Sequence, residues 1–318
     1  MFTDEQKQKI ISTCLQELKS APKPEQIQLN KFIRFRTDKH QNGRLKVIQR
    51  KDGALSWWLC DMARKEETAK RFNEDGTCIQ EPMTAEEYKQ MKQDEQREKE
   101  AEERIIGSFE GYFYGLPKAD SMGVHPYLEA KGLKNSYVGR WDSLNRWLLF
   151  PMYNSAGDIR GLQRIIQTGA NVFGKYYIEH THPLGLFCLL YPPKYDLNMV
   201  YVCEGMATGL SIFEATGNLV VVTFSANNLK EGTKAAALFF TGLYESWKLK
   251  LTESAFFRSV VIVADNDESK TGQNAAFEAG SELGCGVVII PHIGMDANDY
   301  MQAYGKKELR RLLDGYRS

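Results

Sequence analysis

The sequence predicts an α/β fold whose carboxyl-terminal part is a four-stranded parallel sheet flanked by helices. Three observations predict it: the apolar segments are short, each is apolar throughout, and each alternates with a longer helical segment. Continuous apolar strands indicate a sheet that is buried on both faces. The predicted strands are 199–203, 219–224, 259–264 and 286–291, and the predicted helices are 206–217, 228–247, 272–284 and 306–316.

Residues 1–83 are expected to form a small α+β domain. Helical periodicity marks 5–19, where one side carries Ile10, Ile11, Leu15 and Leu18. The segment that follows this helix reads as short strands and turns.

The stretch 31–51 is the most basic part of the chain. It holds eight Lys or Arg residues against one acid, and within or close to it lie Phe32, Phe35, Trp57 and Trp58. Such a surface can hold a phosphate backbone and stack bases. A solvated strand face over core aromatics would have the same composition, so both interpretations stay open. The formal net charge is zero, which lowers the expectation of a nucleic-acid partner unless charge is segregated locally.

Residues 84–104 are expected to form a charged helical linker. They hold almost no apolar residues, and acids and bases recur at i,i+4 spacing, as in Glu95 and Lys99. A coiled coil is disfavoured because apolar heptad positions are missing. Residues 105–198 are then expected to form a second globular region. It contains a short helix at 125–133 and a β-hairpin at 146–166 that turns between Asn154 and Asp158.

Carboxylates follow three of the predicted parallel strands. Glu204 follows the first strand, Asp265 and Asp267 follow the third, and Asp296 and Asp299 come after the fourth. The carboxyl ends of parallel strands meet at one edge of a sheet, where ligands bind. In an extended segment, residues two apart point the same way, so Asp265 and Asp267 should converge.

Crowded carboxylates repel one another unless a cation neutralises them. Oxygen ligands suit hard ions, so the pattern predicts Mg²⁺ (or Mn²⁺) and, through it, contact with substrate phosphates. The alternative is that these acids are helix caps and turn residues, which are common after strands.

The segments "VYVCEG" and "VVIVADND" resemble a TOPRIM domain, the metal-binding fold of bacterial-type primases, topoisomerases and some nucleases. The resemblance implies that residues 199–318 form a TOPRIM domain. It gives Glu204 the role of general acid or base, and Asp265 and Asp267 the role of metal ligands. Asp296 and Asp299 resemble the later acidic element of TOPRIM primases. Asn266 departs from a run that is often all acidic.

The resemblance extends upstream of the TOPRIM segment. "YLEAKGL", "RWLLFPMYNSAGDIRGLQRI" and "KYYIEH" resemble the region that precedes TOPRIM in bacterial primases, which implies that Arg146, Arg164 and Lys175 hold template or nucleotide phosphates. "CEGMATGLSIFEATG" is most similar to primase-like proteins of plasmids and phages. Their amino-terminal region tends to carry an "R-F-R" stretch, which makes Arg34 and Arg36 template-binding candidates. No C-x-x-C pair is present, so the zinc module of replicative primases is not visible.

The resemblance therefore implies a DNA primase that synthesises short RNA primers from ribonucleoside triphosphates on single-stranded DNA, with replication or conjugation proteins as partners. Two alternatives stay open: a TOPRIM nuclease, and a non-catalytic primase-like protein that binds single-stranded DNA.

The cellular setting and one further motif complete the expectations. Scattered cysteines, no signal peptide and no apolar run near the ~18 residues of a membrane span indicate a cytoplasmic protein with no membrane contact. His180 and His182 form an H-x-H without a further ligand nearby in the sequence, and we read them as ordinary loop histidines.

Overall fold

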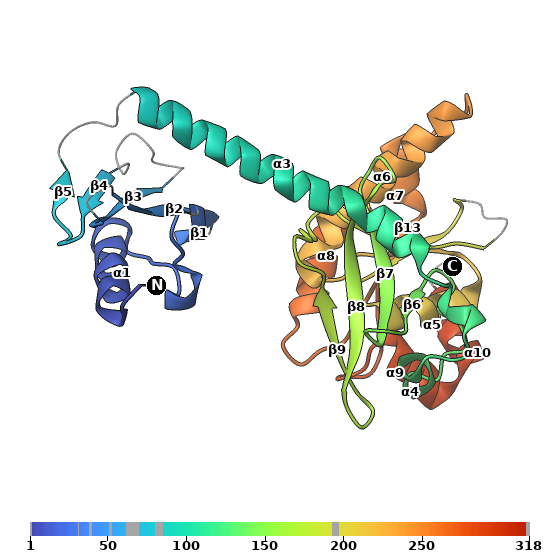
Figure 1. Cartoon of the computed structure of the whole chain (residues 1–318). Helices are drawn as coiled ribbons and strands as arrows, with labels where there is room; N and C mark the ends of the chain where they lie inside the picture. The colour runs from blue at the N-terminus through green and yellow to red at the C-terminus, as the bar shows by residue number, and fades with distance from the viewer. Residues whose placement is uncertain are drawn as a thin grey trace. The chain divides into compact units, whose positions relative to one another are not determined.

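The computed structural model describes residues 2–30, 32–37, 40–50, 53–61, 70–79, 85–192 and 197–315. The chain divides into two compact units, Met1–Glu100 and Ala101–Ser318 (Figure 1). Every helix among the described residues is too short or too polar to cross a membrane.

The first unit is a helix packed on one face of an antiparallel sheet. Its elements are α1 (Asp4–Leu18), η1 (Pro24–Gln26), β1 (Phe32–Thr37), β2 (His40–Gln49), β3 (Leu55–Asp61), β4 (Lys70–Asn73) and β5 (Cys78–Ile79), with the strands in sequential order. Thr3 caps α1 through a capping box with Gln6. The buried side of α1 packs on Phe35 and Trp57 among others. Two of the aromatics that could have stacked bases, Phe35 and Trp57, are therefore core residues, as the alternative interpretation expects.

The linker helix α3 (Ala85–Gly115) begins where the sequence predicts but continues to Gly115. Its last turns carry an apolar stripe, Ile106, Phe109 and Phe113, at i, i+3 and i+7 spacing, which is buried against Leu149 and neighbouring residues. The predicted start of a globular region at 105 therefore falls inside the helix, because the charged pattern ends there while the helical periodicity does not.

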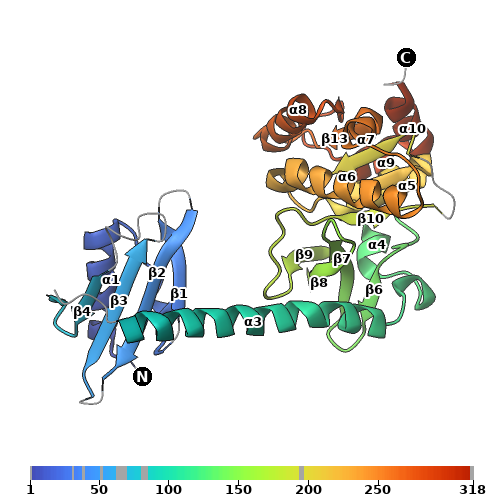
Figure 2. The same ribbon diagram turned by 90° about the horizontal axis from the view of Figure 1, so that it is seen from above.

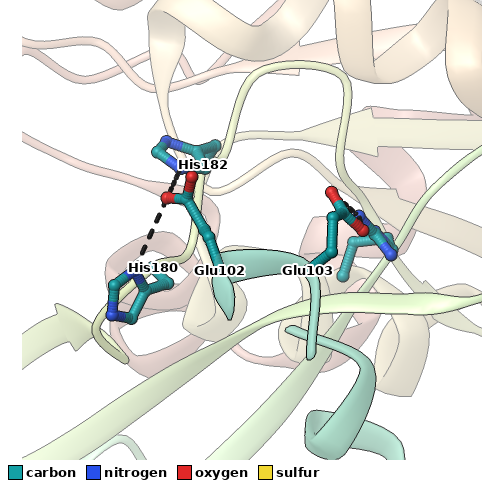
Figure 3. Close-up of polar contacts among 5 residues, drawn as sticks. Glu102, Glu103, His180 and His182 are labelled. Carbon is teal, nitrogen blue, oxygen red and sulfur yellow. Dashed lines mark hydrogen bonds and ion pairs between the residues drawn. The ribbon is translucent and has the colours of Figure 1, made fainter. Parts of the chain in front are cut away.

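Within the second unit, the last turns of α3 also make polar contacts. Glu103 accepts a hydrogen bond from Arg160 Nη2 at 2.8 Å. Glu102 Oε1 lies 3.1 Å from His182 Nε2 and 3.5 Å from His180 Nδ1, so both histidines of the H-x-H face one carboxylate (Figure 3).

Next come η3 (Ala119–Ser121), α4 (Pro126–Ala130) and an antiparallel sheet of β6 (Arg140–Asp142), β7 (Trp147–Tyr153), β8 (Ile159–Gly169) and β9 (Val172–Tyr177). The predicted hairpin is confirmed as β7 and β8, and its turn uses Gly157 at φ 88°. One face of this sheet packs on α3, and the other joins the core of the next sheet (Figure 2).

The carboxyl-terminal region confirms the predicted parallel sheet and adds an unexpected edge strand. The strand order is β10-β12-β11-β13-β14, from β10 (Cys188–Leu190), β11 (Val200–Cys203), β12 (Leu219–Val222), β13 (Val260–Ala264) and β14 (Gly286–Ile289). The last four strands are parallel, and β10 pairs antiparallel with β12. The predicted four-stranded sheet thus has five strands, because the region before residue 199 contributes one.

Helices cover both faces of this sheet. One core contains residues of α5 (Met206–Thr216), α9 (Ala297–Tyr304) and α10 (Lys306–Asp314), and the other contains residues of α6 (Leu229–Ser246), α7 (Glu253–Ser259) and α8 (Thr271–Leu283). A short turn, η4 (Ala226–Asn228), precedes α6. The sequence predicted neither α7 nor α9, which are the two shortest helices around this sheet.

Candidate active and metal-binding site

The predicted carboxylates lie where neighbouring parallel strands end. β11 and β13 are adjacent, and their register pairs Cys203 with Val263. Glu204 directly follows β11, and Asp265 follows β13 after Ala264. The two acids therefore leave the sheet at the same edge, as the strand order predicts.

Gly272, in the first turn of α8, keeps open the space between two of these carboxylates. A β-carbon at this glycine would lie 3.3 Å from Asp267 Oδ2 and 3.8 Å from Glu204 Oε2. These oxygens, from different segments of the chain, thus face one small volume. A larger side chain at position 272 would occupy part of that volume.

Asp267 is held by the start of α8. Its carboxylate accepts hydrogen bonds from Ser269 Oγ at 2.7 Å, Gly272 N at 3.1 Å and Thr271 N at 3.2 Å. These donors, led by the Ser269 hydroxyl, lower the pKa of Asp267 below its ordinary value. Asp267 therefore stays ionised and fixed in direction.

Asp265 and Glu204 are carboxylates whose charge is poorly solvated. Burial, with repulsion from Asp296 and Glu204, raises the pKa of Asp265 to about 7, and Lys175 opposes the rise. Burial also raises the pKa of Glu204, with a further contribution from Asp267. Each acid thus responds to the charge of others, which is the electrostatic signature of a cluster that attracts a cation.

Asp296 and Asp299 begin helix α9. Asp296 Oδ1 accepts from Asp299 N at 2.8 Å, and Asp299 Oδ2 accepts from Asp296 N at 3.3 Å, which together form a capping box. The helix-cap alternative therefore describes this pair. Asp296 also interacts with the Asp265 charge, whereas the carboxylate of Asp299 turns back to its own helix start.

Asn266 has a structural reason to be uncharged. Its Nδ2 donates to the Ile290 carbonyl at 2.8 Å, its Oδ1 accepts from Gln273 Nε2 at 2.5 Å, and its backbone N–H donates to Met295 O at 3.0 Å. An aspartate could not donate the first of these bonds. The residue between the two aspartates thus ties the loop after β14 to the acidic segment.

Of the predicted basic residues, Lys175 is the one brought to the acids. Its charge acts on both Asp265 and Glu204, and its backbone pairs with Ile165. Arg164 lies on the opposite face of the sheet from Lys175, and its guanidinium stacks on Trp147 at 4.6 Å. Arg146 is exposed in the turn before β7. Arg34 and Arg36 are exposed on β1 of the first unit.

Tyr127 is a residue near the site that sequence reasoning missed. Its side chain is 1% exposed, and its hydroxyl has no hydrogen-bond partner within the part of the chain that the structure describes. The charge of Asp296 acts on this hydroxyl. The segment "YLEAKGL" begins with Tyr127, but it gave no sign that this residue lies near Asp296, which is far away in the chain. Gly272, by contrast, could have been suspected as a glycine just after the acids.

The donor set suits a hard divalent cation, since every clustered ligand atom is a carboxylate oxygen. Within the described ranges, no three His, Cys, Asp or Glu side chains stand close enough to bind one ion together. Glu102, His180 and His182 are therefore not a three-ligand metal site. Magnesium keeps several water ligands and needs only one or two carboxylates directly. One or two of Glu204, Asp265 and Asp267 would therefore bind a hydrated Mg²⁺ or Mn²⁺ directly, with water as its other ligands.

A cavity of about 390 Å³ lies elsewhere, lined by Tyr114, Tyr153, Leu219 and Trp247 among other apolar or aromatic residues. Leu219 begins β12, so this cavity is at the opposite end of the parallel strands from the carboxylates. It is not part of the candidate site.

Residues 199–307 match the family model described as a Toprim domain. The matched segment contains all five predicted acids, from Glu204 to Asp299. The sheet of β10 to β14, with helices on both faces, is thus an α/β fold of the Toprim type, as the sequence predicts.

Several solved primase structures are remotely similar to the chain. The DnaG catalytic core is 15% identical with a TM-score of 0.35, over 53% of this chain and 52% of that one. The RNA polymerase domain of the Mycobacterium tuberculosis primase DnaG is 21% identical with a TM-score of 0.34, over 58% and 60%. The primase fragment of the bacteriophage T7 primase-helicase protein is 18% identical with a TM-score of 0.37, over 60% and 74%. The chain therefore spans little more than half the length of the first two structures.

Proposed function

We propose that the protein is a DNA primase of a mobile element such as a plasmid or phage, which makes short RNA primers on single-stranded DNA. The observation that carries the proposal is the meeting of Glu204 and Asp267 at Gly272, with Asp265 beside them and Lys175 facing them. Acids gathered from separate strands, with one nearby cation, suit the handling of nucleotide phosphates. The Toprim match over the same residues supports this assignment.

The reaction joins two nucleotides. The 3′-oxygen of one attacks the α-phosphorus of the next, the bond from that phosphorus to the bridging oxygen breaks, and pyrophosphate leaves. The resemblance to TOPRIM primases gives Glu204 the task of accepting or returning a proton. A bound Mg²⁺ or Mn²⁺ would supply charge neutralisation at the phosphates.

The other residues position substrates. Asp265 and Asp267 would hold the metal. Asp296 is close enough to interact electrostatically with Asp265. Lys175 would contact a phosphate of the incoming ribonucleoside triphosphate, and Arg146 is a second candidate because it is exposed. We assign Arg164 to packing against Trp147, since it lies on the other face of the hairpin sheet.

The first unit would hold the template strand. Arg34 and Arg36 are both exposed and, being two residues apart on β1, lie on one face of the sheet. Arg34 is also paired directly with Arg44 of β2. Lys31, Lys39, Lys51 and the side chain of Phe32 lie outside the described residues.

A TOPRIM nuclease is the second candidate, because the same carboxylates could direct a water molecule at a phosphodiester. Lys175 argues against it. This residue lies on β9, in the sheet that precedes the Toprim segment, and a nuclease needs no such nucleotide-positioning element. A non-catalytic single-stranded DNA-binding protein is the third candidate, and the retained acids argue against it.

Primer synthesis is the deciding experiment. Purified protein is mixed with single-stranded DNA of mixed sequence, labelled ribonucleotides and Mg²⁺ or Mn²⁺, and the products are sized on a gel. We expect short oligonucleotides that disappear in Asp265→Ala/Asp267→Ala and persist in Glu268→Ala, an acid next to the cluster. A degraded template would favour the nuclease, and an intact, bound template without products would favour the binding protein.

A further inference from the structure

Three aromatic rings gather beside the candidate site, and the proposed reaction leaves them without a role. His292 lies in the loop after β14, and Tyr300 and Tyr304 lie one turn apart on α9. The ring centroids of Tyr300 and Tyr304 are 4.7 Å apart. The His292 ring lies 5.2 Å from Tyr304 and 6.1 Å from Tyr300, within 22° of parallel to each. We call these three residues the aromatic stack.

The aromatic stack is open to solvent on one side. Tyr300 packs against the core beneath it, whereas Tyr304 is 46% exposed and His292 is also exposed. Ile293, next to His292, is 74% exposed and extends the apolar surface. Part of the Tyr304 and His292 side chains therefore stays accessible to a ligand.

The stack is fixed to the acidic segment before any ligand binds. Asn266, between the two aspartates, exchanges backbone hydrogen bonds with this loop: its N–H donates to Met295 O at 3.0 Å, and its carbonyl accepts from Gly294 N at 2.6 Å. Asp296, which interacts with Asp265, caps the helix that carries both tyrosines. The loop and the helix that carry the rings are therefore both joined to the acidic segment.

We propose that the aromatic stack is a platform on which an unpaired nucleobase lies when a nucleic-acid strand or nucleotide is bound at the carboxylate edge. This deepens the proposed function and rests on it, since that function places phosphates among the acids. A base has an apolar face that stacks on aromatic rings regardless of its sequence. The phosphates can then lie over the cation-binding acids while the attached base lies on His292 and Tyr304.

The test compares strands with and without bases on the full-length protein. Affinity is measured by fluorescence anisotropy, in Mg²⁺ without ribonucleotides, for a single-stranded DNA and for the same strand made abasic throughout its central part. The variants are Tyr304→Ala, Tyr304→Phe, which keeps the ring, and Phe277→Ala, which removes an aromatic side chain that is 53% exposed on α8.

We expect Tyr304→Ala to bind the normal strand about tenfold more weakly and the abasic strand with unchanged affinity. Tyr304→Phe and Phe277→Ala should behave like the natural protein. The proposal is overturned if Tyr304→Ala weakens both strands equally, since the residue would then act through structure or charge. It is also overturned if the variant weakens neither strand.

The same variants separate this proposal from the proposed function. If the natural protein synthesises primers but every variant binds DNA independently of its bases, the primase proposal holds and the platform proposal is wrong. Base-dependent loss in Tyr304→Ala, without any primer synthesis, would keep the platform as a binding subsite and remove the primase.

Discussion

The ionised carboxylate of Asp265 lowers the free energy of unfolding of the metal-free protein. Burial and two neighbouring acids raise its pKa from 3.8 to about 7. In the unfolded chain this carboxyl loses its proton at a lower pH, so the free energy of unfolding falls as the pH rises from about 4 to about 7. Carboxylates gathered to bind a cation commonly destabilise the metal-free protein in this way. The bound cation neutralises their charge and removes the destabilisation.

Asp265→Asn should therefore stabilise the metal-free protein by roughly 1–3 kcal/mol at pH 8 and by less at pH 5. Denaturant unfolding in EDTA measures this. Asp267→Asn is the matched control with the opposite sign, because hydrogen bonds lower the pKa of Asp267 and favour its charged form. Added Mg²⁺ should stabilise the natural protein more than Asp265→Asn. A variant less stable than the natural protein at pH 8 would contradict the assigned repulsion.

Tyr127 carries a buried hydroxyl without a partner in the described part of the chain, near the charge of Asp296. Removing an unsatisfied hydroxyl should leave stability unchanged or raise it by about 1 kcal/mol. We expect Tyr127→Phe to melt no lower than the natural protein while primer synthesis falls several-fold. Thermal melting and the primer assay, run on the same preparation, check this. A lower melting temperature with full activity would assign the hydroxyl to packing instead.

At the residue scale, what could be predicted depended on distance along the chain. Glu204 and Asp265 could be singled out from the sequence because each directly follows a recognisable strand, and Asp267 comes two residues after Asp265. The reason for Asn266 could not be seen, since its partners Ile290 and Met295 lie in another loop. Asp299 was expected among the metal ligands, and a capping box accounts for its carboxylate.

The elements differ from the predicted ones mainly where a weak local signal is overridden by packing. The charged pattern of α3 stops near 104, but Phe109 and its apolar neighbours extend the helix because they bury against β7 and β8. Strand β10 has three residues and pairs antiparallel with β12, so its short apolar run gave no distinct sequence signal.

Packing should accordingly hold the end of α3 far more strongly than its charges do. Phe109 is 4% exposed, and Phe109→Ala should cost about 3–4 kcal/mol of unfolding free energy. Glu103→Gln removes an exposed ion pair with Arg160 and should cost under ~1 kcal/mol. Urea unfolding followed by tryptophan fluorescence compares the two variants. Equal losses would mean that the polar contacts of Figure 3 hold the helix as firmly as its apolar stripe.

At the scale of the whole molecule, the proposed work is divided between the two units. The acids, Lys175 and the aromatic stack belong to the second unit, and Arg34 and Arg36 belong to the first. The sequence predicted a separate amino-terminal domain from its change in composition, and the structure has a separate helix-and-sheet core there.

Arg34→Ala/Arg36→Ala should weaken binding of single-stranded DNA and reduce its dependence on salt. Two lost phosphate contacts lower the slope of log affinity against log salt by about 1.4. Binding titrations at several salt concentrations measure the slope, with Arg310→Ala/Arg311→Ala on α10 as a control of equal charge. An unchanged slope in the first variant would exclude β1 as the surface that holds the strand.

The edge strand β10 has a consequence for how the chain can be divided. Because β10 pairs with β12, a fragment that began at Met199 would leave the backbone donors and acceptors of Val220 to Val222 without their partners on that side. Bare strand edges recruit other chains, so such a fragment should aggregate, whereas one that began at Ala101 keeps the edge covered. A fragment that carries the carboxylates should therefore also include β10, because without β10 one edge of β12 is exposed.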